Sequence, residues 1–137
     1  MTKKIAVIND LSGFGRCSLT AAISVISAMG IQACPLPTAL LTAQTGYPHY
    51  YMDDYTDKMD IYRQEWLKMG QHFNGIYTGF VASEAQIDQI FHFIETFLHR
   101  HKTFKVTIGK PIPWQTFDRT KRPAEWAKWV EDKVYSL

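Results

Sequence analysis

The residues with the clearest chemical potential lie in the stretch NDLSGFGRCSLTAA, residues 9–22, directly after the apolar run IAVI. Gly13, Gly15 and Ser18 have the spacing G-x-G-x-x-S, which is close to the glycine fingerprint of dinucleotide-binding loops. That fingerprint also requires an acidic residue roughly 20 positions further on, where it binds the ribose. No Asp or Glu lies between Asp10 and Asp53, and the P-loop string G-x-x-x-x-G-K-S/T does not occur. A nicotinamide or flavin site is therefore disfavoured, and a tight turn explains the glycine pair as well as a binding loop does.

A second polar stretch, LLTAQTGY (residues 40–47), shifts the balance towards a binding loop. Thr42, Gln44 and Thr45 interrupt an apolar neighbourhood there. A few directed polar groups on apolar walls are what a small-molecule pocket needs.

Other clusters of titratable side chains have simpler explanations. Four aspartates between residues 53 and 60 could suggest a metal site, but we expect them in the first turn and on the exposed face of a helix, where the dipole favours carboxylates. The histidines form no closed ligand set, and Cys17 and Cys34 have neither metal-site spacing nor a disulfide framework. We therefore predict no metal site.

The pattern of apolar residues predicts alternating strands and helices. The expected strands are 4–9, 31–36 and 75–80, and the expected helices are 17–30, 53–70 and 83–100, with a turn-rich segment at 37–50. Such alternation predicts an α/β sheet with helices on both faces. Ligands bind at the carboxyl ends of the strands in these sheets, so the loops that matter are 10–16, 37–46 and 80–83.

The helices carry further expectations. Ser83 and Gln86 have capping-box spacing at the start of helix 83–100. The buried side of helix 53–70 is expected to consist of Met59, Tyr62, Trp66 and Met69. The buried side of helix 83–100 is expected to consist of Ile87, Ile90, Phe91, Ile94 and Phe97.

Length and composition suit a compact globular protein. The chain has 137 residues and is 46% hydrophobic. Its apolar runs are far shorter than the roughly 18 residues that a membrane span needs. The N-terminus has no long apolar region or cleavage site, so no signal peptide is predicted and the cytoplasm is the expected location.

The character of the chain changes near residue 98. Residues 1–98 hold 6 Lys/Arg and 9 Asp/Glu, a net charge of −3, whereas residues 99–137 hold 9 and 4, a net charge of +5. Three of the four tryptophans (Trp114, Trp126 and Trp129) also lie after residue 98. We predict two regions, 1–98 and 99–137, with an edge or antiparallel strand at 104–109 and a helix at 123–137 that has Pro123 near its first position.

Two blocks of the sequence resemble a known family. INDLSGFGRCSLTAAISVISAMGIQACPLPTALLTAQTG and NGIYTGFVASEAQID are similar to the N-terminal part of bacterial pyridoxal kinases, members of the ribokinase-like superfamily, over roughly residues 4–98. The resemblance implies a three-layer α/β/α ribokinase-like sheet, here truncated and followed by an extra C-terminal strand and helix. It also implies ATP- and Mg²⁺-dependent phosphorylation of the 5′-hydroxyl of pyridoxal, pyridoxine or pyridoxamine, a step of vitamin B6 salvage that produces pyridoxal phosphate.

The resemblance places the first glycine-containing loop on the vitamin side of the cleft, not on the nucleotide side. Asp10 matches a polar position that hydrogen-bonds the pyridine ring, and Thr45 matches the threonine of the second loop. The other expected substrate-binding residues are Cys17, Leu41 and Phe80, at wall positions around the ring, and Gln44, which stands where the family usually has histidine. Ala82 stands where the family has glycine, which puts the backbone of that loop in doubt.

The rest of a kinase site is not recognisable in the sequence. The resemblance predicts an Asp-Pro-Val stretch for magnesium and phosphates, and a glycine-rich segment ending in Gly-Asp that supplies the anion hole and the catalytic aspartate. TIGKPIP stands where Asp-Pro-Val is expected, and no Gly-Asp occurs. Phosphoryl transfer depends on these groups, so we expect no catalytic residue in this chain and no kinase activity from it alone.

The last segment has its own resemblance. KVTIGKPIPWQTFDRTKRPAEWAKWVEDKVYSL (105–137) is similar to the C-terminal end of bacterial lysophospholipid acyltransferase-like proteins, without the H-x-x-x-x-D acyltransfer motif. An alternative function is therefore a non-catalytic binding or interaction module that uses this basic tail. A solvated helix is favoured over a membrane-binding one, and nucleic acid is not expected because acids interrupt the basic residues.

A truncated parallel sheet exposes a strand edge, which strand 104–109 or a second copy in a homodimer would cover.

Overall fold

The computed structural model describes residues 2–98, 112–113, 116–118 and 120–136. The chain divides into two compact units, Met1–Lys102 (unit 1) and Thr103–Leu137 (unit 2). The predicted strand at 104–109 lies outside the described residues.

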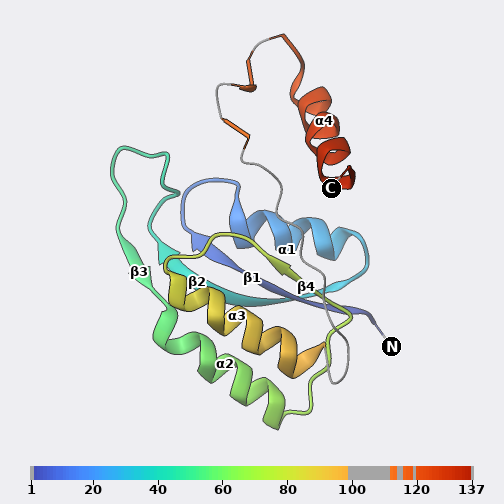
Figure 1. The fold of residues 1–137 in the computed structure, drawn as a ribbon. Coiled ribbons are helices and arrows are strands. Elements are labelled where there is room, and N and C mark those ends of the chain that lie inside the picture. The colour runs from blue at the N-terminus through green and yellow to red at the C-terminus, as the bar shows by residue number, and fades with distance from the viewer. Residues whose placement is uncertain (1, 99–111, 114–115, 119, 137) are drawn as a thin grey trace. The chain divides into compact units, whose positions relative to one another are not determined.

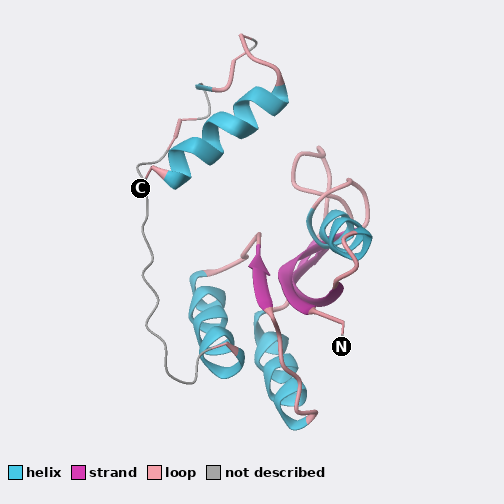
Figure 2. Ribbon diagram, turned by 90° about the vertical axis from the view of Figure 1, so that its right-hand side faces the viewer, coloured by secondary structure: helices cyan, strands magenta, loops and turns pink. Residues whose placement is uncertain are grey.

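Unit 1 is built on a four-stranded sheet with the strand order β3-β2-β1-β4. Its elements in chain order are β1 (Lys4–Ser12), α1 (Ser18–Ala28), β2 (Gln32–Leu41), β3 (Met52–Asp54), α2 (Thr56–Lys68), β4 (Gly75–Thr78) and α3 (Glu84–Phe97). β1 is parallel to β2 and β4, and β3 is antiparallel to β2. Helix α1 covers one face of the sheet, and α2 and α3 cover the other (Figures 1 and 2). This arrangement confirms the expected three-layer α/β/α fold class.

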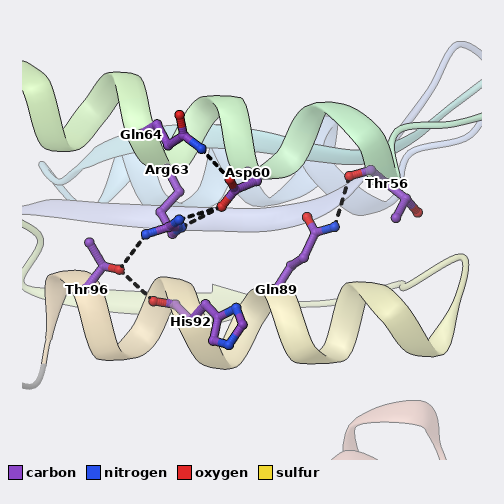
Figure 3. A network of polar contacts seen from close by, with 7 residues as sticks. All are labelled: Thr56, Asp60, Arg63, Gln64, Gln89, His92 and Thr96. Carbon is purple, nitrogen blue, oxygen red and sulfur yellow. Dashed lines mark hydrogen bonds and ion pairs between the residues drawn. The ribbon is translucent and has the colours of Figure 1, made fainter.

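The core lies between the sheet and the pair α2–α3. Side chains alternate between the faces of a strand, so Ala6 and Ile8 of β1 point to this side. They meet Leu36, Met59, Phe73 and Phe93, with Tyr62, Trp66 and Phe97 packed around them. Polar contacts along the outer side of the same helix pair add to this packing (Figure 3).

These polar contacts centre on Arg63 of α2. Its Nε donates to Asp60 Oδ1 at 2.7 Å and its Nη1 donates to Thr96 Oγ1 of α3 at 3.2 Å. Gln89 of α3 donates through Nε2 to the Thr56 carbonyl at 3.1 Å (Figure 3). The hydrogen bonds from Arg63 and Gln64 hold the pKa of Asp60 below its usual range.

The end of β2 differs from the prediction. The strand continues to Leu41, so the turn expected from residue 37 is wrong for residues 37–41. Pro35 and Pro37 suggested a break, because proline lacks an N–H. The Gln32 N–H points to β1, where it donates to the Lys3 carbonyl at 2.9 Å, so the N–H groups of Cys34 and Leu36 also face β1, before the register irregularity near Asn9. The two prolines therefore face the other edge, which β3 pairs only from Ala39 to Leu41, and they remove no ladder hydrogen bond.

The segment before α2 also differs from the prediction. Residues 52–54 form β3, and α2 begins at Thr56 instead of residue 53. Asp54 ends the strand, and its Oδ1 accepts from the N–H of Thr56, the first residue of the helix, at 2.7 Å. Asp57 does lie in the first turn, as expected. Met69 was expected on the buried side of α2, but it follows the helix and is exposed.

The buried side of α3 was predicted correctly in part: Ile90 and Phe97 pack against the core, but Ile87 and Phe91 do not. Ile87 and Phe91 are 43% and 52% exposed, whereas Gln86 and Phe93 are buried. The capping box is also wrong: Ser83 is the N-cap, but no side-chain cap bond forms, and the Gln86 side chain turns into the protein. Gln86 is buried beside this apolar side because its amide finds hydrogen-bond partners inside the protein, which offset the cost of burying it.

Unit 2 contains α4 (Pro123–Tyr135), with Pro123 in its first turn as predicted. Glu125 accepts from the Arg122 backbone N–H at 2.7 Å and completes a capping box. Phe117, Trp126 and Trp129 pack edge to face, and Trp126 Nε1 donates to the Asp118 carbonyl at 3.1 Å. None of the helices that the structure describes is long and apolar enough to cross a bilayer.

Candidate functional site

A pocket of about 410 Å³, open to solvent, lies where β1, β2 and β4 end. It is lined by Asp10, Cys17, Ser18, Leu41, Gln44, Thr45 and Phe80. The structure thus brings all six predicted substrate-binding residues into one pocket and adds Ser18. Their roles towards a ligand stay predictions.

The first and second loops come together because the ladder between β1 and β2 continues beyond the strands. The Gly13 N–H donates to the Leu41 carbonyl at 2.8 Å, and the Phe14 N–H to the Thr42 carbonyl at 3.1 Å. The Gln44 N–H in turn donates to the Phe14 carbonyl at 2.9 Å. These bonds place Gln44 and Thr45 opposite the start of α1.

Asp10 is the buried charge of the pocket, with 5% of its surface exposed. Ser12 Oγ donates to its Oδ2 at 2.8 Å. No other donor among the described residues reaches this carboxylate, so Oδ1 is left without a protein partner. Gln89 Oε1 is the only solvent-excluded side-chain oxygen or nitrogen without a partner among the described residues, so Asp10 Oδ1 is reachable from the open pocket. It can accept a hydrogen bond from a ligand N–H or O–H there.

Gln44 is held by its own loop. Its Oε1 accepts from the Gly46 N–H at 2.9 Å, so the amide is oriented before any ligand arrives. Its side chain also covers Gly15, where an added Cβ would lie 2.7 Å from Gln44 Cγ. Gly15 has φ +112°, a conformation that side chains rarely adopt. The glycine of the first loop therefore serves a close approach between the two loops.

Ser18 is the site residue that the sequence reasoning missed. It lines the pocket at the start of α1 and has φ +54°. Left-handed backbone is uncommon outside glycine, and it often marks functional sites. The available signal was its position in G-x-G-x-x-S, since Ser18 occupies the third position of the glycine fingerprint.

Ala82 raised a doubt that the structure removes. Ser18 is the only non-glycine residue with positive φ in the part of the chain that the structure describes, so Ala82 needs no glycine conformation. Its N–H donates to Gln86 Oε1 at 2.9 Å. The loop after β4 is therefore well formed with alanine at this position.

The described residues do not offer a metal site. No group of three His, Cys, Asp or Glu side chains among them could hold a metal ion. Of the aspartates between residues 53 and 60, Asp54 bonds to Thr56 and Gln86, and Asp60 bonds to Arg63 and Gln64. Asp54 and Asp60 are therefore engaged by neighbouring side chains and backbone of unit 1.

Comparisons with solved structures agree with this geometry. A protein assigned as a phosphomethylpyrimidine kinase from Bacteroides thetaiotaomicron, in a crystal form with pyridoxal, is 46% identical with a TM-score of 0.71, over 73% of this chain and 35% of that one. Pyridoxal kinase from Lactobacillus plantarum is 30% identical with a TM-score of 0.67, over 71% of this chain and 35% of that one. This chain therefore spans about a third of the length of the kinases it matches.

A second, short similarity concerns a different protein. Lyso-glycine lipid O-acyltransferase from Bacteroides thetaiotaomicron is 67% identical over 43 residues, which are 31% of this chain and 16% of the acyltransferase. The corresponding protein of Phocaeicola vulgatus is also 67% identical over 43 residues. This matches the resemblance expected for the tail.

No protein-family model matches the chain. The structural matches cover about 72% of its length, and the two described above are supported by sequence identity as well as by fold. Over that part, the chain is similar in both fold and sequence to a portion of the pyridoxal and phosphomethylpyrimidine kinases.

Proposed function

We propose that the pocket at the ends of β1, β2 and β4 binds pyridoxal or a close relative, pyridoxine or pyridoxamine. The observation that carries the proposal is the buried Asp10 carboxylate, whose Oδ1 lacks a partner among the described residues, in a pocket with apolar walls. The Bacteroides thetaiotaomicron protein crystallised with pyridoxal supports the choice of ligand.

Each lining group has a role in this proposal. Asp10 Oδ1 accepts a hydrogen bond from an N–H or O–H of the ring. Leu41, Cys17 and Phe80 cover the flat faces of the ring, where dispersion and burial contribute most. Gln44 and Thr45 supply polar contacts at the ring edge, and Gln44 is already oriented by Gly46.

We further propose that this chain binds the vitamin without phosphorylating it. Phosphoryl transfer needs groups that neutralise charge on the phosphates, and ATP with Mg²⁺ would supply the phosphoryl group. The expected Asp-Pro-Val and Gly-Asp segments do not occur in the sequence. The proposed setting is vitamin B6 salvage in the cytoplasm, with a homodimer as the expected assembly.

Calorimetric titration of pyridoxal into the full chain tests binding. Asp10→Asn keeps the shape but removes the charge, and we expect it to weaken binding about tenfold or more, as for a lost charged hydrogen bond. Asp57→Asn, an exposed change on α2 outside the pocket, is the matched control and leaves the affinity unchanged. No heat with pyridoxal, or equal affinity in Asp10→Asn, refutes the binding proposal.

A separate assay tests the proposed lack of kinase activity. The chain is incubated with ATP, Mg²⁺ and pyridoxal, and pyridoxal phosphate is measured against a control without protein. We expect no difference. Product at a rate within about a hundredfold of typical kinase turnover would refute the proposed inactivity.

The second candidate function is an interaction module in unit 2. The observation that favours it is that α4 buries none of its residues, although Trp126 and Trp129 lie on it with Lys121 and Lys133 over their rings. Co-sedimentation with phosphatidylglycerol vesicles at low salt tests the membrane version of this candidate. Loss of binding in Trp129→Ala supports it, and no binding of the unmodified chain removes it.

A further inference from the structure

The loop between β4 and α3, residues 79–83, is fastened by buried side chains from three other elements. At its first turn, the Phe80 N–H donates to Asn9 Oδ1 of β1 at 2.8 Å. The Phe80 carbonyl accepts from Thr38 Oγ1 of β2 at 2.7 Å. Both backbone groups of a pocket residue are therefore held by side chains that lie on separate strands.

Asn9 connects Phe80 directly to Asp10. The same Oδ1 atom accepts from the Asp10 N–H at 3.0 Å. The backbone N–H groups of Asp10 and Phe80 thus share one acceptor, Asn9 Oδ1. Gly79 makes this possible, because the Asn9 side chain occupies the space that a Cβ at Gly79 would need.

Gln86 fastens the other end of the loop. It is fully buried on α3, and its Oε1 accepts from the Ala82 N–H at 2.9 Å. Its Nε2 donates to the Thr38 carbonyl at 2.8 Å, so the two attachments meet at Thr38. Burying three polar side chains stabilises one arrangement only when all of them are paired, which restricts the loop to a single position.

These hydrogen bonds matter most for the position of the Phe80 ring. This residue is 40% exposed and lines the pocket, so packing alone does not determine where its ring lies. The position of the ring then depends on its backbone. Asn9 and Thr38 hold that backbone from the side of the sheet.

We propose that Asn9, Thr38 and Gln86 are positioning residues, which set the distance between the Phe80 ring and the Asp10 carboxylate for a flat ligand. This inference rests on the proposed function. It goes beyond the lining residues, because none of the three touches the pocket. Their effect on the ligand is transmitted through hydrogen bonds to the loop.

The test compares Thr38→Val with Thr38→Ser in the full chain. Valine keeps the shape but removes the donor to the Phe80 carbonyl, whereas serine retains it. We expect Thr38→Val to weaken pyridoxal binding about threefold to tenfold and to accelerate hydrogen exchange at the Phe80 amide about tenfold. The amides of β1 report global stability and serve as the reference, and Thr38→Ser restores both quantities to within about twofold.

Gln86→Met is a second variant with its own prediction. The side chain keeps its length but loses the bond to Ala82, so exchange accelerates at the Ala82 amide, again relative to β1. Unchanged local exchange in both Thr38→Val and Gln86→Met overturns the inference. So does faster exchange at Phe80 without any loss of pyridoxal affinity. If the unmodified chain binds no pyridoxal, the proposed function fails instead, and the exchange rates still decide whether these residues hold the loop.

Discussion

The two units each contain a cluster of aromatic rings, and only one of these clusters is a core. In unit 1, Trp66, Phe73, Phe93 and Phe97 have centroids 4.6–5.9 Å apart. In unit 2, Phe117, Trp126 and Trp129 have centroids 5.4–6.4 Å apart, all edge to face, whereas the pairs of unit 1 are partly edge to face and partly tilted. Phe93 is 2% exposed, whereas α4 buries no residue at all. Favourable ring geometry is therefore not sufficient for burial.

The two clusters differ in how many separate elements of the chain supply their aromatic rings. The rings of unit 1 come from α2, α3 and the segment before β4, and they pack with Ile8 of β1 and Leu36 of β2 in one core. The rings of unit 2 come from one helix and a residue shortly before it. Several elements can surround a ring completely, but a single helix covers only one side of it.

The largest expected effect is the removal of a ring from the core. Phe93→Ala leaves a cavity beneath α2 and α3, and we expect a loss of about 3–5 kcal/mol in the free energy of unfolding, measured with urea. Phe91→Ala on the same helix is the matched control, because Phe91 is largely exposed. We expect that control to cost less than about 1 kcal/mol. Equal losses in both variants would contradict the assignment of the α3 face.

A smaller effect is expected in unit 2. Trp129→Ala removes a ring that is only partly covered, so we expect a cost of less than about 1 kcal/mol, measured from the loss of α4 helicity on heating. The unfolding of unit 1 in urea, followed by amide signals of β1, serves as the control and stays unchanged. A cost above about 2 kcal/mol would show that the rings of unit 2 are covered as a core.

The smallest effect concerns pH. Asp60 joins α2 to the Arg63 network, and hydrogen bonds from Arg63 and Gln64 lower its pKa. A folded pKa below the unfolded value adds stability above the unfolded value, and this is lost as the pH falls through the folded pKa. With the side chain 42% exposed, screening limits the contribution to less than about 1 kcal/mol.

Asp60→Asn should therefore reduce stability slightly at neutral pH and flatten its decline in acid, as measured by urea unfolding across pH 3–7. Asp118 of unit 2 also has a lowered pKa, caused by its own neighbour Thr120. Asp118→Asn is the control and leaves the pH dependence of unit 1 unchanged. An effect of Asp118→Asn on unit 1 as large as that of Asp60→Asn would contradict the local nature of the unit 2 interactions.

Short-range sequence patterns and the family resemblance were sufficient to predict a large part of the fold and of the candidate site. The apolar run before Asn9 predicted β1, and the loops at strand ends predicted where a pocket would form. The six expected pocket residues were named from a resemblance that covers both loops. These features depend on neighbours in the sequence and on a shared topology, so they can be read without coordinates.

Other features were decided only by tertiary contacts. Pro35 and Pro37 look like strand breakers until the neighbouring strand shows that their missing N–H groups face an edge with no partner beside them. On helix α3, Gln86 is buried by its hydrogen bonds to Thr38 and Ala82, whereas the apolar Ile87 and Phe91 stay exposed.

The sequence by itself therefore determined the order of the elements of unit 1 other than β3, the strand-end loops and the residues that belong to them. The tertiary structure decided the burial of Gln86 on α3, the continuation of β2 to Leu41, the left-handed Ser18 and the attachment of Phe80 by Asn9 and Thr38. The physical reason is that periodicity and spacing act over a few residues, whereas a buried polar group takes its partner from any strand or helix within hydrogen-bond distance.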